Sequence, residues 1–336
     1  MKILLHCHTP FFLAHGGAQI QIEQTKSGLE KIGVAVEYLR WWDENQTGDI
    51  LHQIGAMDAP LLALAHQKGW KLAMTLLLTE TCNRSNWGLF MRRVPIRAAL
   101  AAPIPRSIKS RLYWQVYRQC DRMIVGLEAE RMVLEKVYGI KPERVSVVPL
   151  GLTDAYLRAG PRTRTGDHLI CTGTIRPSKN SLELARLAQA ARTPILFVGK
   201  PFDFNSAYWR DFERLIDGKT VKHQTHVGNE PELIKLLQAA RGFVLMSRYE
   251  NWSLAAHEAA ACGLPVLLPD QRWARERFGQ HASYWPKKGR DEAVAALRKF
   301  YDACPGLPAP GIKQYSWVDA AEMLRDIYAQ MLGEPQ

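Results

Sequence analysis

The sequence contains no long uninterrupted apolar run, and this absence narrows the classes of protein to which it can belong. A membrane-spanning helix needs about 20 predominantly apolar residues, whereas the most apolar segments here, residues 61–65 and 72–78, have the length of a strand or a core helix. The sequence therefore predicts a chain that does not cross a bilayer. The apolar start, residues 2–5, is interrupted by His6 and His8, so we interpret it as a buried strand rather than a signal peptide and expect a cytoplasmic protein.

Paired cysteine motifs are also missing. The six cysteines are scattered along the 336 residues, and none belongs to a Cys-x-x-Cys pair. Zinc sites and disulfide frameworks both depend on clustered cysteines, so the pattern predicts reduced, packed thiols. His6, Cys7 and His8 alternate along the first expected strand, which favours packing over metal ligation. We therefore expect neither a bound metal nor a cofactor.

Acidic residues are absent between Glu80 and Asp121, although residues 84–118 are rich in arginine and aromatic side chains. The net charge of +11 suggests an acidic partner and says little about the fold. In an arginine-rich helix, the arginines usually keep their charged groups in water while their aliphatic parts pack on the protein. The interleaved aromatic side chains, however, favour an element at an anionic membrane surface. No base-stacking sheet or helix-turn-helix pattern indicates nucleic acid. The residues predicted to face the membrane or an acceptor are Arg92, Arg93, Arg97 and Arg106.

The chain does contain enough apolar residues, 47% of its composition, to build two domains of ordinary size. Short β-rich runs alternate with amphipathic helical patterns, which predicts parallel sheets covered by helices. We predict a first domain at residues 1–158, a polar linker at 159–166, a second domain at 167–314 and a final helix at 315–336 that returns toward the first domain. The expected strands are residues 2–8, 34–39, 50–52, 72–78, 123–125, 145–148, 169–172, 195–198, 243–246 and 266–268.

The most informative stretch, residues 247–266, reads Ser-Arg-Tyr-Glu-Asn-Trp-Ser-Leu-Ala-Ala-His-Glu-Ala-Ala-Ala-Cys-Gly-Leu-Pro-Val. It predicts the end of a strand, a polar loop and a short helix. Ser253 is placed as the N-cap, Gly263 closes the helix and Pro265 prevents its continuation. The first N–H groups of such a helix are unpaired and carry partial positive charge, which suits a phosphate.

Two carboxylates border this loop and helix. Glu250 and Glu258 lie eight residues apart and would not share one helix face. With Glu250 in the loop, however, both can line one ligand and accept hydrogen bonds from neighbouring hydroxyls, as on a sugar. Two glutamates alone are more often solvated. The N-cap, the alanine-rich helix and the Gly-x-Pro exit favour a binding site instead.

The Glu250-x7-Glu258 spacing, followed by Ala-Ala-Ala-Cys-Gly-Leu-Pro-Val, resembles the retaining nucleotide-sugar glycosyltransferases of family 4, which have the GT-B fold. The resemblance implies an α/β fold of two Rossmann-like, doubly wound domains facing across a cleft, with a C-terminal helix after the second. The first domain would lie on the acceptor side and the second would bind the donor. Further matching motifs follow in order along nearly the whole chain. They are Gly16-Gly17-Ala18-Gln19, Val148-Pro149-Leu150-Gly151, Gly173-Thr174-Ile175-Arg176-Pro177-Ser178-Lys179-Asn180, Val227-Gly228-Asn229 and Tyr315-Ser316-Trp317.

The resemblance also implies roles for individual residues. Glu250 would bind the transferred sugar and Glu258 the ribose hydroxyls of the nucleotide. Lys179, with Arg176, would neutralise the departing nucleoside diphosphate in place of a metal ion. The other residues expected around the donor are Gly16, Gly17, Gly173, Thr174, Val227, Gly228, Asn251, Trp252, Ser253 and Leu254.

These implications predict a retaining, metal-independent glycosyltransferase with a UDP- or GDP-linked sugar donor. The expected acceptor is a glycan or a lipid-linked saccharide in cell-surface polysaccharide or glycolipid synthesis, with the enzyme peripheral on the inner face of the membrane. Two departures keep an alternative open: Thr174 stands where the family usually has arginine, and Leu77 where it has histidine. The alternative is a non-catalytic nucleotide-sugar or glycan-binding protein on the same scaffold.

Overall fold

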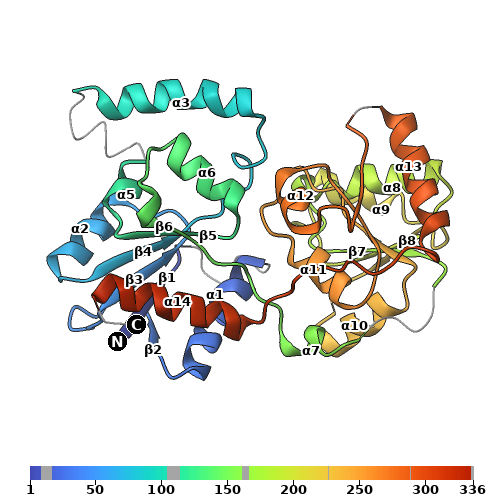
Figure 1. Ribbon diagram of the computed structural model, residues 1–336. Helices are drawn as coiled ribbons and strands as arrows, with labels where there is room; N and C mark the ends of the chain where they lie inside the picture. The colour runs from blue at the N-terminus through green and yellow to red at the C-terminus, as the bar shows by residue number, and fades with distance from the viewer. Residues whose placement is uncertain (9–16, 104–113, 161–165, 226, 288, 334–336) are drawn as a thin grey trace. The chain divides into compact units, whose positions relative to one another are not determined.

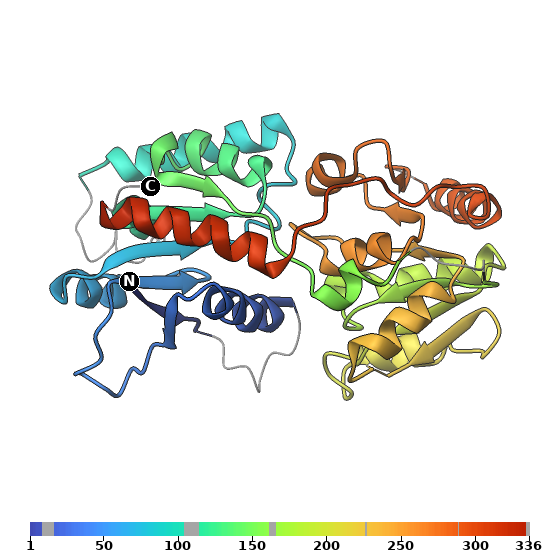
Figure 2. The ribbon, with the colours of Figure 1, turned by 60° about the horizontal axis from the view of Figure 1, so that its bottom comes forward.

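The computed structural model describes residues 1–8, 17–103, 114–160, 166–225, 227–287 and 289–333. It divides the chain into two compact units (Figure 1): unit 1 comprises residues 1–151 and 315–336, and unit 2 comprises residues 152–314. Each unit is built on a six-stranded parallel sheet covered by helices, and Figure 2 shows the last helix crossing unit 1. The division after Gly151 precedes the polar stretch 159–166 that composition indicated as the linker.

Unit 1 contains the first six strands and six of the described helices. Its strands are β1 (Lys2–His6), β2 (Ala35–Tyr38), β3 (Ile50–Ile54), β4 (Lys71–Thr75), β5 (Arg122–Val125) and β6 (Val145–Val147). Its helices are α1 (Gly17–Lys31), α2 (Ala59–Gln67), α3 (Asn86–Ala101), α5 (Trp114–Gln119), α6 (Glu128–Lys136) and α14 (Trp317–Leu332), with a 3₁₀ turn at Pro142–Arg144. The strand order is β2-β1-β3-β4-β5-β6, and every pairing is parallel.

Helices α1 and α14 pack together on one face of this sheet, with α5 and α6 on the opposite side (Figure 1). Leu29 of α1 and Leu324 of α14 share a core with Ile3 and Ile50 of the sheet. The two helices approach so closely that a Cβ at Gly28 would lie 2.6 Å from the carbonyl oxygen of Trp317. Glycine is therefore required at this crossing.

A buried chain of hydrogen bonds ties α14 to the sheet. The Tyr328 hydroxyl lies 2.6 Å from Nδ1 of His52, and Nε2 of His52 lies 2.7 Å from Oγ1 of Thr75. Burial lowers the pKa of His52 to about 4, so its imidazole is neutral at pH 7. A neutral imidazole has one donor and one acceptor nitrogen, and both are used here.

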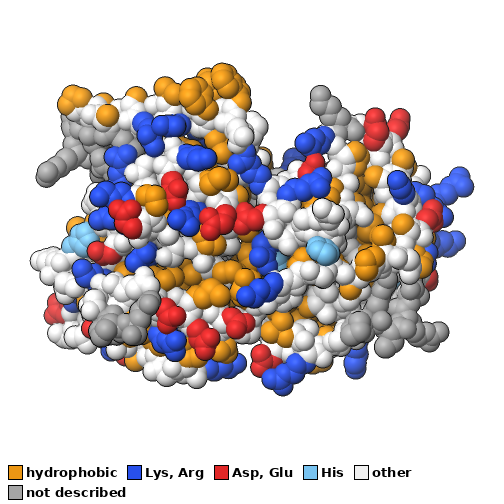
Figure 3. All heavy atoms as spheres, viewed as in Figure 1, with side chains coloured by type: hydrophobic (Ala, Val, Ile, Leu, Met, Phe, Trp, Pro, Cys, Tyr) orange, Lys and Arg blue, Asp and Glu red, His pale blue; other side chains and the backbone are white. Residues whose placement is uncertain are grey.

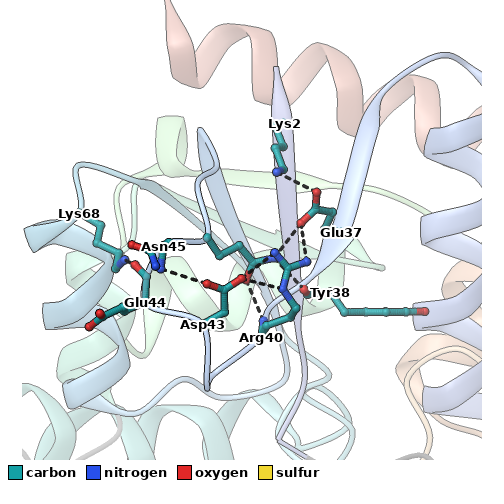
Figure 4. A network of polar contacts seen from close by, with 9 residues as sticks. Lys2, Glu37, Tyr38, Arg40, Asp43, Glu44, Asn45 and Lys68 are labelled. Carbon is teal, nitrogen blue, oxygen red and sulfur yellow. Dashed lines mark hydrogen bonds and ion pairs between the residues drawn. The ribbon is translucent and has the colours of Figure 1, made fainter.

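A network of ion pairs holds the loop between β2 and β3 (Figure 4). Glu37 pairs with Lys2 at 2.8 Å and with Arg40 at 3.0 Å, while Arg40 also pairs with Asp43 at 2.8 Å. Hydrogen bonds from Lys2 and from Gln46 hold the pKa of Glu37 down to about 2. The loop leaves the edge strand β2 in a conformation fixed by charged side chains rather than by apolar packing.

Helix α3 is the outermost helix of unit 1 and lies beyond α6 in Figure 1. Its arginines are not all placed as the sequence analysis expected. Arg93 is exposed, but Arg92 donates to Oγ1 of Thr81 at 3.0 Å. Arg97 donates to the carbonyl of Lys136, at the end of α6, at 3.2 Å. Helix C-termini attract cations, which explains this inward position. Arg106 lies outside the described residues.

Unit 2 begins with α7 (Asp154–Leu157), which packs against α10 and α11. Its strands are β7 (Leu169–Thr172), β8 (Ile195–Val198), β9 (Val221–Gln224), β10 (Gly242–Val244), β11 (Val266–Leu268) and β12 (Ser283–Tyr284). Its other helices are α8 (Ser181–Ala190), α9 (Ala207–Glu213), α10 (Glu230–Gln238), α11 (Leu254–Ala261), α12 (Arg272–Phe278) and α13 (Arg290–Ala303), with a 3₁₀ turn at Pro177–Lys179.

The second sheet has the order β12-β11-β10-β7-β8-β9. After β7, the chain adds β8 and β9 on one side of that strand. It then returns and adds β10, β11 and β12 on the other side. The loops after β7 and β10 therefore diverge, and such a switch point is where doubly wound sheets bind ligands. The predicted pair of Rossmann-like domains is confirmed.

The six cysteines are free, and all but the half-buried Cys7 are buried, as expected for packed thiols. In the described part of the chain, no helix has both the length and the apolar character needed to span a bilayer.

We expect Tyr328→Phe to lower the free energy of unfolding by about 1–3 kcal/mol, because it leaves a buried nitrogen of His52 without its partner. Urea denaturation followed by circular dichroism measures the change. Glu322→Gln, at an exposed position of the same helix, is the control and should change stability little. Equal stability of Tyr328→Phe and the control would show that the hydrogen bond does not hold α14 in place.

Candidate functional site

The candidate site lies where the loops after β7 and β10 leave the sheet of unit 2. The backbone N–H of Arg248, after β10, donates to the carbonyl of Ser178, after β7, at 2.8 Å. All strands of the sheet are parallel, so both loops lie at its carboxyl edge. This hydrogen bond joins two segments that are about 70 residues apart in the sequence.

An ion pair links the same two loops. Lys179 Nζ donates to Oε1 of Glu250, and the side chains of both residues are largely shielded from water, with exposed fractions of 29% and 11%. Ser247 Oγ donates to the same carboxylate oxygen at 3.1 Å. A carboxylate that accepts hydrogen bonds from a cation and a hydroxyl is held in position. The sequence analysis named Lys179 and Glu250 but missed Ser247.

Gln271 fixes the loop that carries Glu250. Its Nε2 donates to the carbonyls of Ser247, at 3.1 Å, and Arg248, at 2.9 Å, while its Oε1 accepts from the indole N–H of Trp273 at 2.9 Å. Sequence reasoning missed this residue. The one signal was its position three residues after the end of strand β11 and directly before helix α12, at the ligand-binding edge of the sheet.

Helix α11 begins beside the ion pair. The side chain of its N-cap, Ser253, accepts from the N–H of Ala256 at 3.3 Å. The preceding Trp252 is buried; its ring stacks on His257 with centroids 4.6 Å apart and lies under the Arg277 guanidinium at 4.4 Å. Burial lowers the pKa of His257 to about 3, so the stack contains a neutral imidazole. The large Trp252 side chain thus packs within unit 2 and fixes the helix start.

The second carboxylate, Glu258, sits in α11 in a different environment. It is half-buried, and burial, together with the nearby Glu230, raises its pKa to about 7. Glu230 is in turn held by the Thr153 hydroxyl at 2.9 Å. At neutral pH, Glu258 is therefore poised between its two protonation states.

The remaining donor-site candidates of unit 2 lie on loops at the same edge. Gly173 follows β7 with φ +138°, a conformation open to glycine, and Thr174 follows it half-buried. Arg176 is exposed, with its guanidinium over the Phe202 ring at 5.0 Å. After β9 come the buried Val227 and the exposed Gly228.

A close backbone contact shapes the edge between β7 and β8. A Cβ at Gly199 would lie 2.1 Å from the carbonyl oxygen of Gly173, so no larger residue fits there. Of the first-unit candidates, Gly17 begins α1 and Gly16 lies outside the described residues. The predicted site residues that the structure brings into contact are thus Lys179 and Glu250, with Asn251, Trp252, Ser253 and Leu254 following directly along the chain.

Comparison with known proteins identifies the family of this domain. Residues 164–303 match the family described as glycosyl transferases group 1. The match covers most of unit 2. The matched segment contains both loops of the candidate site and the whole of α11. The resemblance to glycosyltransferases drawn from the motifs is thereby confirmed, whereas the assignment to family 4 stays a prediction.

Relatives in sequence carry glycosyltransferase names. The chain is 28% identical over 158 residues to the GDP-mannose:cellobiosyl-diphosphopolyprenol alpha-mannosyltransferase of Xanthomonas campestris, a match covering 44% of this chain and 40% of that protein. It is 25% identical over 333 residues to the D-inositol 3-phosphate glycosyltransferase of Nocardia farcinica, covering 86% and 71%. Matches to the first curated relatives span about 40% of those proteins.

Solved structures confirm the GT-B fold. Anabaena HepE, crystallised with UDP and glucose, has a TM-score of 0.66 at 13% identity, covering 98% of this chain and 99% of that one. Sucrose-phosphate synthase from Thermosynechococcus elongatus has a TM-score of 0.68 at 16% identity, covering 99% of both chains. At such identities the likeness establishes the fold alone.

We expect Lys179→Met to destabilise unit 2 by about 1–3 kcal/mol, because it leaves the shielded Glu250 carboxylate without its cation. The double variant Lys179→Met/Glu250→Gln removes the unpaired charge and should recover most of that loss. Urea denaturation midpoints measure both. Arg214→Met, which breaks the exposed pair with Asp211, is the control and should have little effect. A double variant less stable than Lys179→Met would contradict this account.

Proposed function

We propose that the protein is a retaining glycosyltransferase that moves a sugar from a nucleoside diphosphate sugar to an acceptor hydroxyl. The observation that carries the proposal is the Lys179–Glu250 pair at the switch point of unit 2, beside the N-terminus of α11. A cation suits a diphosphate, a carboxylate suits sugar hydroxyls, and a helix N-terminus suits an anion. One nucleotide sugar offers all three partners.

In the proposed reaction, the bond between the sugar C1 and the diphosphate oxygen breaks while the acceptor oxygen bonds to C1. The acceptor attacks from the face that the diphosphate leaves, and its proton passes to the departing phosphate oxygen. Lys179 stabilises the negative charge that develops on the diphosphate, with Arg176 approaching from the exposed rim. Glu250 orients the sugar through its hydroxyls, and Glu258 accepts from the ribose. These cations take the place of a metal ion.

We further propose a UDP- or GDP-linked donor and a glycan or lipid-linked saccharide acceptor. The Xanthomonas campestris relative is named for GDP-mannose and a diphosphopolyprenol-linked acceptor, and HepE was crystallised with UDP. Both names support the proposal without distinguishing the nucleobases. A lipid-linked acceptor places the enzyme at the inner face of the membrane, in the synthesis of cell-surface polysaccharide or glycolipid.

A non-catalytic nucleotide-sugar or glycan-binding protein on this scaffold is the alternative. Thr174 gives the loop after β7 one cation fewer than the family pattern, and the exposed Leu77 replaces the first-domain histidine. The intact Lys179–Glu250 pair favours the enzyme, because binding alone does not require a cation placed to stabilise a leaving group.

We expect Lys179→Met and Glu250→Gln each to reduce sugar transfer by roughly 10²–10³-fold, since each removes one charged contact to the reacting donor. The assay follows nucleoside diphosphate release from UDP- and GDP-sugars in the presence of membrane extract. Glu213→Gln, an exposed change at the end of α9, should retain full activity. Near-normal turnover in both site variants would refute the mechanism. Binding of a donor without release in any extract would favour the alternative.

We expect donor affinity to fall as the pH falls from 8 to 6. Protonation of Glu258, whose pKa is about 7, removes an acceptor for the ribose hydroxyls, so affinity should weaken by about tenfold. An intact nucleotide sugar is the ligand to use, because its diphosphate diester lacks the phosphate pKa near 6. Calorimetry at several pH values measures the profile. Glu258→Gln should make it flat, and a flat profile for the unaltered protein would exclude this role.

A further inference from the structure

Helix α3 carries an exposed apolar stripe on its outer side. The stripe consists of Trp87, Phe90, Met91 and Val94, whose exposed fractions are 69%, 51%, 54% and 55%. Their spacing places them on one face of the helix. Trp87 and Phe90 stack on each other with ring centroids 5.8 Å apart. Figure 3 shows apolar side chains gathered along the outer edge of α3, with basic side chains below them.

Helix α3 exposes apolar side chains on its outer side, where an ordinary surface helix carries polar ones. A helix on a water-soluble domain turns its apolar face inward and its charged face outward. Here the half-buried Arg92 and Arg97 hydrogen-bond to Thr81 and to the carbonyl end of α6, whereas the aromatic side chains are exposed. Ile96 is buried between them and the rest of unit 1. The exposed face that carries the stripe is therefore suited to contact an apolar partner rather than water.

Charge around the stripe selects the kind of partner. Residues 81–120 contain no acidic side chain, so the region can approach an anionic surface without repulsion from its own sequence. Arg93 is exposed on the flank of the helix, and Arg84 is exposed just before the helix, although it pairs with Glu80. Aromatic rings beside arginines are typical of helices that lie in the headgroup region of a bilayer.

We propose that this stripe docks α3 onto an anionic lipid bilayer, with the helix lying in the plane of the surface. The 16 residues of α3 span about 24 Å, enough to lie along the headgroups and too few apolar residues to cross the membrane. Trp87 and Phe90 enter the boundary between headgroups and acyl chains, and Arg93 meets lipid phosphates. The inward arginines hold α3 on unit 1 so that docking also positions that unit. This inference does not depend on the proposed enzymatic activity.

The test is co-sedimentation of the full-length protein with vesicles of phosphatidylcholine alone and with vesicles containing phosphatidylglycerol. We expect binding to the anionic vesicles that weakens with added salt. Trp87→Ser/Phe90→Ser should reduce the partition coefficient at least about tenfold, since two large apolar side chains no longer leave water. Arg93→Gln should weaken binding to anionic vesicles by a smaller factor.

The matched control is Trp41→Ser/Trp42→Ser. These two tryptophans are also in unit 1 and even more exposed, at 82% and 68%, but they lie on the loop after β2. Their loss should leave vesicle binding unchanged if α3 is the docking element. Thermal unfolding should be unchanged in both double variants because all four side chains are exposed. Donor binding should be unchanged because the Lys179–Glu250 pair lies in unit 2.

Three results would overturn the proposal. The first is equal vesicle binding by the unaltered protein and Trp87→Ser/Phe90→Ser. The second is an equal loss in the Trp41→Ser/Trp42→Ser control, which would indicate nonspecific aromatic adsorption. The third is an absence of vesicle binding together with a dimer that Trp87→Ser/Phe90→Ser converts to a monomer in gel filtration, because a second copy of the chain would then cover the stripe.

Discussion

The ion pair between Lys179 and Glu250 is the interaction on which the functional interpretation depends. It joins the loop after β7 to the loop after β10, and it sits where the strand order of unit 2 reverses. Ser247 and Gln271 fix the carboxylate side of the pair through hydrogen bonds to the side chain and to the loop backbone. Opposite charges are therefore presented at the sheet edge in a fixed geometry, which would lower the reorganisation that the proposed donor binding and sugar transfer require.

The two glutamates, eight residues apart, have different electrostatic environments. Glu250 has a cation and a hydroxyl as partners, whereas Glu258 is half-buried near Glu230, and its pKa is raised to about 7. This difference supports separate roles, in which Glu250 is held in place by its partners and Glu258 responds to pH. The match of residues 164–303 to the glycosyl transferases group 1 family supports the proposed donor site, and the contacts indicate how each residue would act within it.

Much of this fold and site could be predicted from the sequence because the signals are local. The Ser253 cap, the glycine and proline after α11, and the short apolar strands β7, β8, β10 and β11 all follow from neighbouring residues. The strand β9 was missed because Val221–Gln224 lacks an apolar alternation, and β12 because it has two residues. Gln271 acts through contacts across the sheet edge, which no sequence spacing reveals.

The orientation of the basic, aromatic segment, residues 84–118, could not be predicted from the sequence. Composition indicated the kind of surface, but it placed the arginines outward, and the structure turns Arg92 and Arg97 inward against Thr81 and the end of α6. Helical spacing shows which residues of α3 share a face. It does not show which of those faces packs against the rest of unit 1. The orientation is fixed by the hydrogen bonds of Arg92 to the Thr81 hydroxyl and of Arg97 to the carbonyl of Lys136.

The most direct test of the central claim is a crystal structure of the protein with an intact nucleotide sugar. The account predicts Lys179 Nζ within about 3 Å of a diphosphate oxygen and the Glu250 carboxylate within the same distance of a sugar hydroxyl. A donor bound away from the β7–β10 switch point, with the Lys179–Glu250 pair making no contact to it, would contradict the account.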